Sequence, residues 1–246
     1  MKIIIGHLYP DLLNIYGDRG NIICLKKRSQ WRNIEIKIIN LSLNDQLNPN
    51  QCDLFFGGGG QDRQQAIIAR DLQKKKSVLQ QEADRGVPML TICGSYQLFG
   101  HFFQTHKGKK IPGISIFNAY TVASYQRKIG NITIKANNQS LPFSCQLVGF
   151  ENHSGNTFIK KAGPNKTLPL GKVIKGFGNN GRDKTAGAVF KNVIGSYLHG
   201  PILPKNPQLA DFLISQALET KYQRKINLKP LDDQLEYQAQ QKALKR

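Results

Sequence analysis

Short apolar runs alternate with longer amphipathic segments through the first hundred residues. The apolar runs, each of strand length, are residues 2–6, 34–41, 53–56 and 87–92. Helical spacing of apolar positions follows or separates them in residues 21–31, 64–85 and 96–99. This alternation predicts a mostly parallel sheet with helices on both faces, the arrangement of α/β proteins.

The second half of the chain has a different pattern. Residues 111–198 are rich in β-branched residues, Gly and Asn and contain few helical spacings. We expect additional, partly antiparallel strands, followed by a helix. The expected segments are strands at 114–122, 130–135, 146–150 and 187–198 and a helix at 208–218. We therefore predict one domain over residues 1–220 and a Lys/Gln-rich, basic tail over 221–246, either a peripheral helix or partly disordered.

Composition limits the class of protein. The 246 residues carry a formal net charge of +19, and residues 85–210 contain 16 Lys or Arg but two acidic residues. Such a field attracts nucleic acid, anionic lipid, anionic substrates or an acidic protein, unless it is merely a solvated surface. No apolar run approaches the roughly 20 residues that cross a bilayer, and no secretory signal begins the sequence. We expect a cytoplasmic protein without a transmembrane segment.

The four cysteines form neither Cys-x-x-Cys pairs nor a Cys/His cluster of zinc-site spacing, so we expect free thiols and no metal. Cys93 stands apart from the other three. Residues 91–100 read Thr-Ile-Cys-Gly-Ser-Tyr-Gln-Leu-Phe-Gly, an apolar strand that ends at a cysteine and leads into a helix. This pattern is typical of a nucleophile elbow, where the helix N-terminus favours the thiolate. A buried core cysteine at a strand end is the alternative.

Four consecutive glycines follow another strand. Phe56 is followed by Gly57 to Gly60 and then by Gln61 and Asp62, so the backbone is bare at a strand end. The segment is neither a Walker A loop nor a clean Gly-x-Gly-x-x-Gly motif. We predict an oxyanion hole formed by the Gly94 N–H and an N–H of this loop, from Gly58 or Gly59. A flexible turn is the alternative reading.

Two histidines are candidates for a general base. His199 comes directly after the apolar run Val-Ile-Gly-Ser-Tyr-Leu and before Gly-Pro, at the end of a predicted strand. His153 lies in the segment Gly-Phe-Glu-Asn-His-Ser-Gly of residues 149–155. Open α/β sheets place their sites at strand ends, which favours His199.

Together these motifs resemble one family. Residues 8–21 (Leu-Tyr-Pro-Asp-Leu-Leu-Asn-Ile-Tyr-Gly-Asp-Arg-Gly-Asn), the glycine loop, residues 93–100, residues 149–155 and residues 197–201 occur in the order found in class I glutamine amidotransferases of the cobyric acid synthase type. The N-terminal segment is most similar to the glutaminase subunits of bacterial lipid II isoglutaminyl synthases. The resemblance covers about residues 2–215 and implies a flavodoxin-like α/β fold.

The resemblance also implies an activity and a partner. The chain would release ammonia from L-glutamine and pass it to an ATP-using, Mur-ligase-like subunit, MurT. That subunit would amidate the α-carboxyl of D-glutamate in lipid II at the inner face of the membrane, during peptidoglycan synthesis. Cys93 would be the nucleophile, His199 the base, and Arg127 the residue that holds glutamine. No cofactor is expected in this chain, and ATP and Mg²⁺ would bind the partner.

The sequence departs from the family in two places. The family usually has Gly where Ser95 follows Cys93-Gly94, and a positive φ there would strain a serine. Many class I amidotransferases have His-x-Glu, whereas Gly200 and Pro201 follow His199. A third member of the site would then come from elsewhere, with Glu151 and Asp18 as the candidates.

Three alternatives remain at this stage. One is the amidotransferase part of a cobyrinate or cobyric acid synthase, although no ATP-binding loop accompanies it. Another is a nucleic-acid-binding protein with a degenerate amidotransferase fold, although aromatic residues do not interleave the basic run. The third is an inactive scaffold, against which the intact Cys93 and His199 argue.

Overall fold

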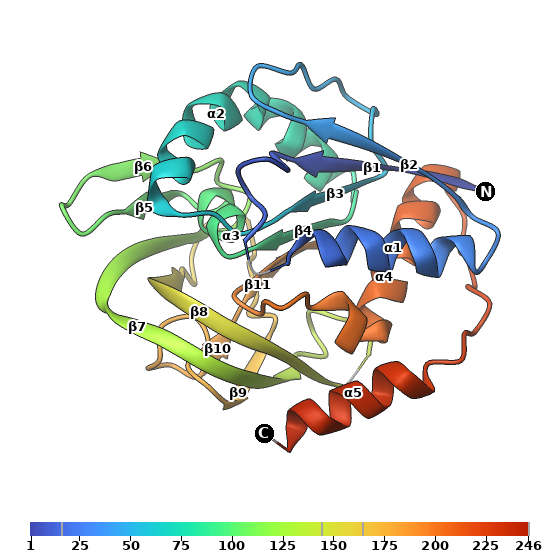
Figure 1. Ribbon diagram of the computed structural model, residues 1–246. Helices are drawn as coiled ribbons and strands as arrows, with labels where there is room; N and C mark the ends of the chain where they lie inside the picture. Colours follow the sequence, from blue (N-terminus) through green and yellow to red (C-terminus); the bar gives the residue numbers. More distant parts are fainter. Residues whose placement is uncertain (16, 144, 164, 246) are drawn as a thin grey trace.

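The computed structural model describes residues 1–15, 17–143, 145–163 and 165–245, and its strands form two sheets (Figure 1). Among these residues the first sheet has six strands in the order β11-β12-β4-β3-β1-β2. Their bounds are β1 Lys2–Leu8, β2 Glu35–Leu41, β3 Leu54–Gly57, β4 Met89–Ile92, β11 Ala188–Phe190 and β12 Val193–Ser196. Neighbouring strands are parallel except for β11, which is antiparallel to β12.

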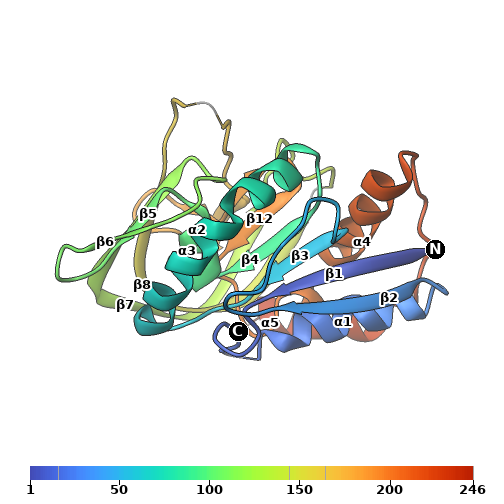
Figure 2. The same ribbon diagram turned by 90° about the horizontal axis from the view of Figure 1, so that it is seen from above.

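Helices cover both faces of this parallel sheet, as expected where each helix connects parallel strands. Helices α1 and α4 contact each other on one face, and α2 and α3 lie on the other (Figure 2). The helical bounds are α1 Arg19–Gln30, α2 Asp62–Asp84, α3 Gly94–Phe99, η1 Leu203–Lys205, α4 Pro207–Tyr222 and α5 Gln234–Leu244. None of the described helices is long and apolar enough to cross a membrane.

The second sheet is dominated by a long hairpin. Strands β7 and β8 pair antiparallel, and their register shifts between Ala123 and Lys128, which marks a bulge. The path through the sheet is β10-β9-β7-β5-β6, with β8 on β7. The bounds are β5 Phe102–Gln104, β6 Lys110–Pro112, β7 Ala119–Ala136, β8 Gln146–Ile159, β9 Gly171–Lys175 and β10 Thr185–Ala186.

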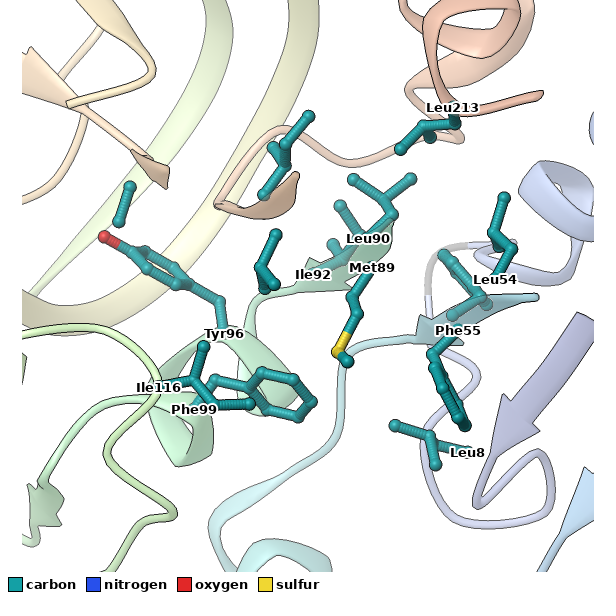
Figure 3. Packing of buried hydrophobic residues seen from close by; sticks show 14 of the residues in the cluster. Leu8, Leu54, Phe55, Met89, Leu90, Ile92, Tyr96, Phe99, Ile116 and Leu213 are labelled. Atoms are coloured by element: carbon teal, nitrogen blue, oxygen red, sulfur yellow. The ribbon is translucent and has the colours of Figure 1, made fainter. Parts of the chain in front are cut away.

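A continuous apolar core joins the two sheets to the helices. Met89, Leu90 and Ile92 of β4 are fully buried, as an apolar strand in the middle of a parallel sheet should be. Figure 3 shows side chains of β3, β4, α3 and α4 converging on this region. Tyr96 of α3 packs edge-on against Phe117, with ring centroids 5.6 Å apart. The strand that ends at Cys93 is therefore held from both faces.

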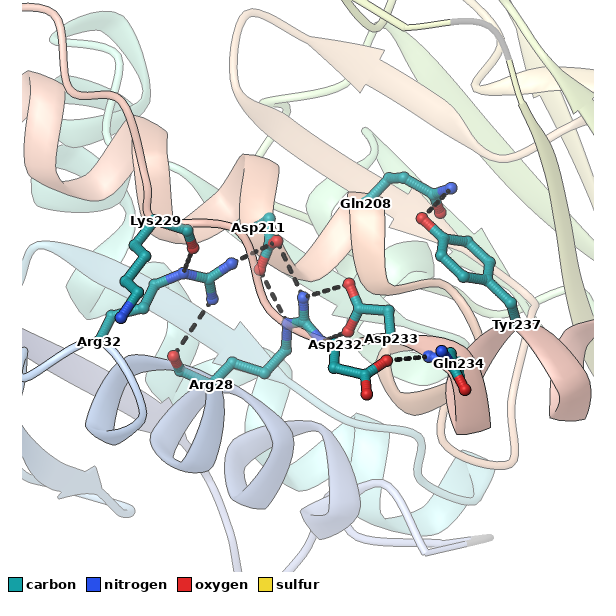
Figure 4. Close-up of polar contacts among 9 residues, drawn as sticks. All are labelled: Arg28, Arg32, Gln208, Asp211, Lys229, Asp232, Asp233, Gln234 and Tyr237. Carbon is teal, nitrogen blue, oxygen red and sulfur yellow. Dashed lines mark hydrogen bonds and ion pairs between the residues drawn. The ribbon is translucent and has the colours of Figure 1, made fainter.

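A buried ionic cluster fastens the C-terminal segment to α1 (Figure 4). The Arg28 guanidinium is 2% exposed and makes paired hydrogen bonds to Asp211 of α4, both 2.8 Å, and to Asp233, 2.5 and 3.0 Å. Arg32 donates to Asp211 at 2.7 Å and to the Lys229 carbonyl at 2.7 Å. Charge-assisted bonds on all sides compensate for the desolvation of Arg28.

The structure confirms the predicted α/β class and the parallel sheet of the first half. The second half differs in detail. Residues 114–118 precede β7 rather than belonging to it, and the two strands expected at 130–135 and 146–150 are parts of the much longer β7 and β8. Strands β5, β6, β9 and β10 were not predicted; each is short and none coincides with one of the apolar runs identified in the sequence. In the predicted tail the structure places α5, which contacts η1 and β8.

Candidate active site

Cys93 occupies a strained turn between β4 and α3. Its backbone has φ 51° and ψ −103°, which side-chain-bearing residues rarely adopt and which costs about 1–3 kcal/mol. The Cys93 N–H donates to the Ser196 carbonyl of β12 at 2.8 Å, and Gln97 N–H closes the first helical turn on the Cys93 carbonyl at 3.0 Å. The turn raises the thiol above the sheet edge, as in a nucleophile elbow.

Ser95 is not the strained residue of the elbow. A serine at position 95 would be strained only if that position had a positive φ; Ser95 lies within α3, and the positive φ belongs to Cys93. The Ser95 hydroxyl donates to the Gly58 carbonyl at 2.6 Å. Serine in place of glycine therefore adds a link between the elbow and the glycine loop.

His199 reaches the same sheet edge from β12. Strand β12 is parallel to β4 with Ser196 opposite Ile92, so the chain leaves both strands side by side. His199 then forms an isolated bridge to Phe150 of β8, with N–H to carbonyl distances of 2.8 and 3.2 Å. The side chain is fully buried. A rigid backbone on both sides fixes the imidazole for proton transfer.

Of the two acidic candidates, the structure places Asp18 beside His199. Asp18 Oδ1 lies 3.7 Å from His199 Nδ1, and Asp18 Oδ2 accepts the Gly59 N–H at 2.6 Å. Glu151 instead accepts the Phe177 and Gly178 N–H groups at 2.6 and 3.0 Å and faces His153 at 3.5 Å. Glu151 is thus committed to a neighbouring turn and to the other histidine.

The two histidines have opposite electrostatic environments. Burial disfavours a charged His199, but the Cys93 sulfur and the Asp18 carboxylate outweigh it and raise the pKa of His199 to about 10. Burial lowers the pKa of His153, although Glu151 opposes this effect. His153 stacks flat on Tyr197, with ring centroids 3.6 Å apart, and its Nδ1 donates to the Gly155 carbonyl at 2.9 Å. His199 is therefore the histidine that is coupled to the thiol.

The glycine loop packs tightly against the site. A Cβ on Gly58 would lie 2.3 Å from the Leu13 carbonyl oxygen, and one on Gly59 would lie 3.0 Å from His199 Cε1. The Gly59 N–H, one of the two predicted oxyanion donors of this loop, donates to Asp18 and so is already engaged. Gly60 lines the cavity beside Cys93, and its nitrogen lies 2.9 Å from the position of a Cβ on Gly94.

A cavity of about 710 Å³ opens over Cys93. The predicted ligand Arg127 lines it from the bulge of β7, together with Asn152 of β8, and Arg127 Nε donates to Asn152 Oδ1 at 2.7 Å. Lys128, the neighbouring cation, is buried and donates to Asn156 Oδ1 at 2.6 Å. Of these two adjacent cations, Arg127 therefore faces the cavity and Lys128 does not.

Two glutamines in the cavity wall were not predicted from the sequence. Gln97 accepts from Gln65 Nε2 at 2.9 Å and donates to the Tyr197 hydroxyl at 3.0 Å. Gln65 also donates to the Gly60 carbonyl at 3.3 Å. The signal for Gln97 was present, because a residue four positions after Cys93 on a helix lies on the same face. Gln65 of α2 offered no comparable signal.

The arrangement combines a strained cysteine, a histidine coupled to it, a carboxylate behind the histidine and free space above the sulfur. Such a site supports acyl transfer through a thioester. Solved structures with the same fold include "Structure of PurLQS from Thermotoga maritima", with a TM-score of 0.58 at 16% identity, over 91% of this chain and 100% of that one. Fold, site and a matching family model together define the class: the chain is a glutamine amidotransferase.

The family model of the CobB/CobQ-like glutamine amidotransferase domain matches residues 4–207, and the chain belongs to this family. It is 39% identical to the lipid II isoglutaminyl synthase (glutamine-hydrolyzing) subunit GatD of Staphylococcus aureus, over 98% of this chain and 94% of that protein. It is 40% identical to the GatD subunit of Streptococcus pneumoniae, over 93% and 85%. The family resemblance expected from the motifs is thereby confirmed.

Proposed function

We propose that this chain is the glutaminase subunit of a lipid II isoglutaminyl synthase. The observation that carries the proposal is the Cys93–His199–Asp18 arrangement at the head of a cavity, in a chain aligned with two GatD subunits over nearly its whole length. The cobyric-acid-type alternative shares the family model, but the cobyric acid synthases that match are only 26–29% identical over 47–73% of this chain. The nucleic-acid alternative has no support from the fold.

In the proposed reaction, the Cys93 thiolate attacks the side-chain amide carbon of L-glutamine. The N–H groups of Gly94 and Gly60 are proposed to stabilise the oxyanion, with Gly58 as the other candidate, since the Gly59 N–H donates to Asp18. The His199 imidazolium gives its proton to the departing ammonia, and Asp18 stabilises that charged form. The neutral imidazole then deprotonates a water molecule that attacks the thioester; glutamate is released, and the Cys93 thiolate and the His199 imidazolium are restored.

Arg127 is proposed to bind the α-carboxylate of glutamine. A planar guanidinium can form two parallel hydrogen bonds with a carboxylate, and Arg127 lines the cavity that Cys93 opens into. The hydrogen bond from Arg127 Nε to Asn152 Oδ1 orients the guanidinium.

Amidation of the acceptor is proposed to take place on a second, ATP-using subunit of the Mur ligase type, MurT. ATP and Mg²⁺ would bind to that partner. Amide formation from a carboxylate needs activation, and ammonia must reach that carboxylate before it is lost to water. Two exposed apolar side chains lie near Asn152, which lines the cavity. Ile129 (52% exposed) is the cross-strand partner of Asn152, and Phe150 (36% exposed) lies two residues before Asn152 on β8. We propose that the partner covers this rim, in the cytoplasm.

Reconstitution tests the proposal. The purified chain, glutamine, ATP, Mg²⁺ and lipid II are mixed with and without the candidate partner, and amidated lipid II is measured by mass spectrometry. Product should require both proteins and disappear with Cys93→Ala. Amidation without a partner, or amidation of a cobyrinate acceptor in preference to lipid II, would contradict the assignment.

A further inference from the structure

Three exposed lysines lie close together on the second sheet, away from the cysteine site. Lys135 of β7 pairs directly with Lys172 of β9, and Lys184 precedes β10, whose Thr185 pairs with Lys172. All three line one shallow hollow of about 560 Å³. Like charges directly opposite each other on a sheet destabilise it. The arrangement therefore favours an anionic ligand that would relieve the repulsion.

The neighbouring carboxylate is engaged in its own turn. Asp183 also lines the hollow, but its Oδ1 accepts from the Thr185 N–H and hydroxyl at 2.8 and 2.7 Å. Its Oδ2 accepts from Asn180 Nδ2 at 2.7 Å. Among the described residues, no ion pair joins Lys135, Lys172 or Lys184 to an acidic side chain. The hollow thus keeps a net positive charge.

An exposed apolar side chain lies close to Lys172 along β9. Ile174 is 54% exposed and lies two residues after Lys172, on the same face of β9. Cations flanking exposed apolar side chains are the composition of surfaces that lie in the membrane interface.

We propose that this lysine face, defined by Lys135, Lys172, Lys184 and Ile174, docks on anionic phospholipid membranes. The lysines would contact lipid phosphates while Ile174 enters the interfacial zone. Juxtaposed lysines each contribute about 1 kcal/mol to binding of an anionic leaflet. The biological reason for such docking rests on the proposed lipid-linked substrate, but the physical argument does not depend on the cysteine chemistry.

Vesicle sedimentation tests the proposal with the full chain. The vesicles contain equal parts of phosphatidylglycerol and phosphatidylcholine, or phosphatidylcholine alone, at 50 and 300 mM salt. The triple variant Lys135→Gln, Lys172→Gln, Lys184→Gln should bind anionic vesicles about 100-fold more weakly. Ile174→Ser should weaken binding with little change in its salt dependence. A matched control replaces the exposed Lys26, Lys27 and Lys37 of α1 and β2 by Gln and removes equal charge.

The control should retain binding within about threefold of the parent chain. Equal losses in both triple variants, or binding only to RNA or DNA added in parallel, would overturn the proposal. Thermal melting of each variant shows that it is folded. Ammonia release from glutamine, measured in the same samples, separates the two hypotheses: intact glutaminase activity without vesicle binding defeats only the membrane proposal.

Discussion

The carboxylate of Asp18 lies 3.7 Å from the Nδ1 of His199, and both side chains are fully buried. Asp18 directly precedes α1, and His199 follows β12, so the pair joins the two halves of the chain. This relationship gives His199 an acidic neighbour without the His-x-Glu motif that the sequence lacks.

Asp18→Asn should reduce glutamine hydrolysis by about 100-fold or more, because the imidazolium loses its charge partner. The pKa of His199 should fall below its present value of about 10, which NMR titration of the imidazole measures. Glu151→Gln is the matched control and should retain a larger share of the activity. A larger loss in the Glu151 variant would make Glu151 the third member.

A glutamine-like diazo-ketone should alkylate Cys93 and leave the other three cysteines unmodified. Burial raises the pKa of Cys24 and Cys52 to about 12 and that of Cys145 to about 11, so they are thiols at pH 8. Peptide mapping locates the adduct. Cys93→Ala should abolish both labelling and ammonia release, and an adduct on another cysteine would move the nucleophile.

Arg127→Ala should raise the KM for glutamine about 10- to 100-fold, the effect of losing charge-assisted hydrogen bonds. The kcat should change much less, because the residue is proposed to bind a remote carboxylate. Lys128→Met is the matched control variant, because Lys128 donates to Asn156 and does not line the cavity. Initial-rate kinetics decide the matter, and an unchanged KM in Arg127→Ala would remove this role.

Stability should fall in mild acid partly through His7. Burial is the main cause that lowers the pKa of His7, to about 4, against about 6.5 in an unfolded chain. Between pH 6.5 and 4 the unfolded state binds more protons, so stability decreases as pH falls and levels off below 4. His7→Gln should lose less Tm than the parent between pH 7 and 5, measured by calorimetry. Parallel Tm curves would contradict this.

Arg28→Met should destabilise the fold by about 3 kcal/mol, because Asp211 and Asp233 lose the charge that compensates them. Urea unfolding measures the change. Lys191→Met removes an exposed ion pair with Asp84 and should cost less than about 1 kcal/mol. Equal effects of the two substitutions would show that the buried cluster contributes no more than a surface pair.

The predictable part of the structure was the part with local signals. Apolar runs identified the parallel strands, and the strand–cysteine–helix pattern identified the Cys93 elbow. The position of Asp18 beside His199, and the bond from the Gly59 N–H to Asp18, depend on contacts between segments distant in sequence. The register shift between Ala123 and Lys128, within which Arg127 lies, is equally invisible, because the sequence of β7 has no periodicity that marks it.

The Arg28 cluster also orders events during synthesis. Asp211 and Asp233 follow Arg28 by 183 and 205 residues. At about 5–20 residues per second, roughly 10 to 40 s separate the translation of Arg28 from that of Asp233. Until then the Arg28 guanidinium of the nascent α1 lacks the Asp211 and Asp233 carboxylates to which it bonds in the finished fold. Asp18 immediately precedes α1, so we expect the final position of this catalytic-site carboxylate to be secured only after α4 and the segment leading to α5 have been made.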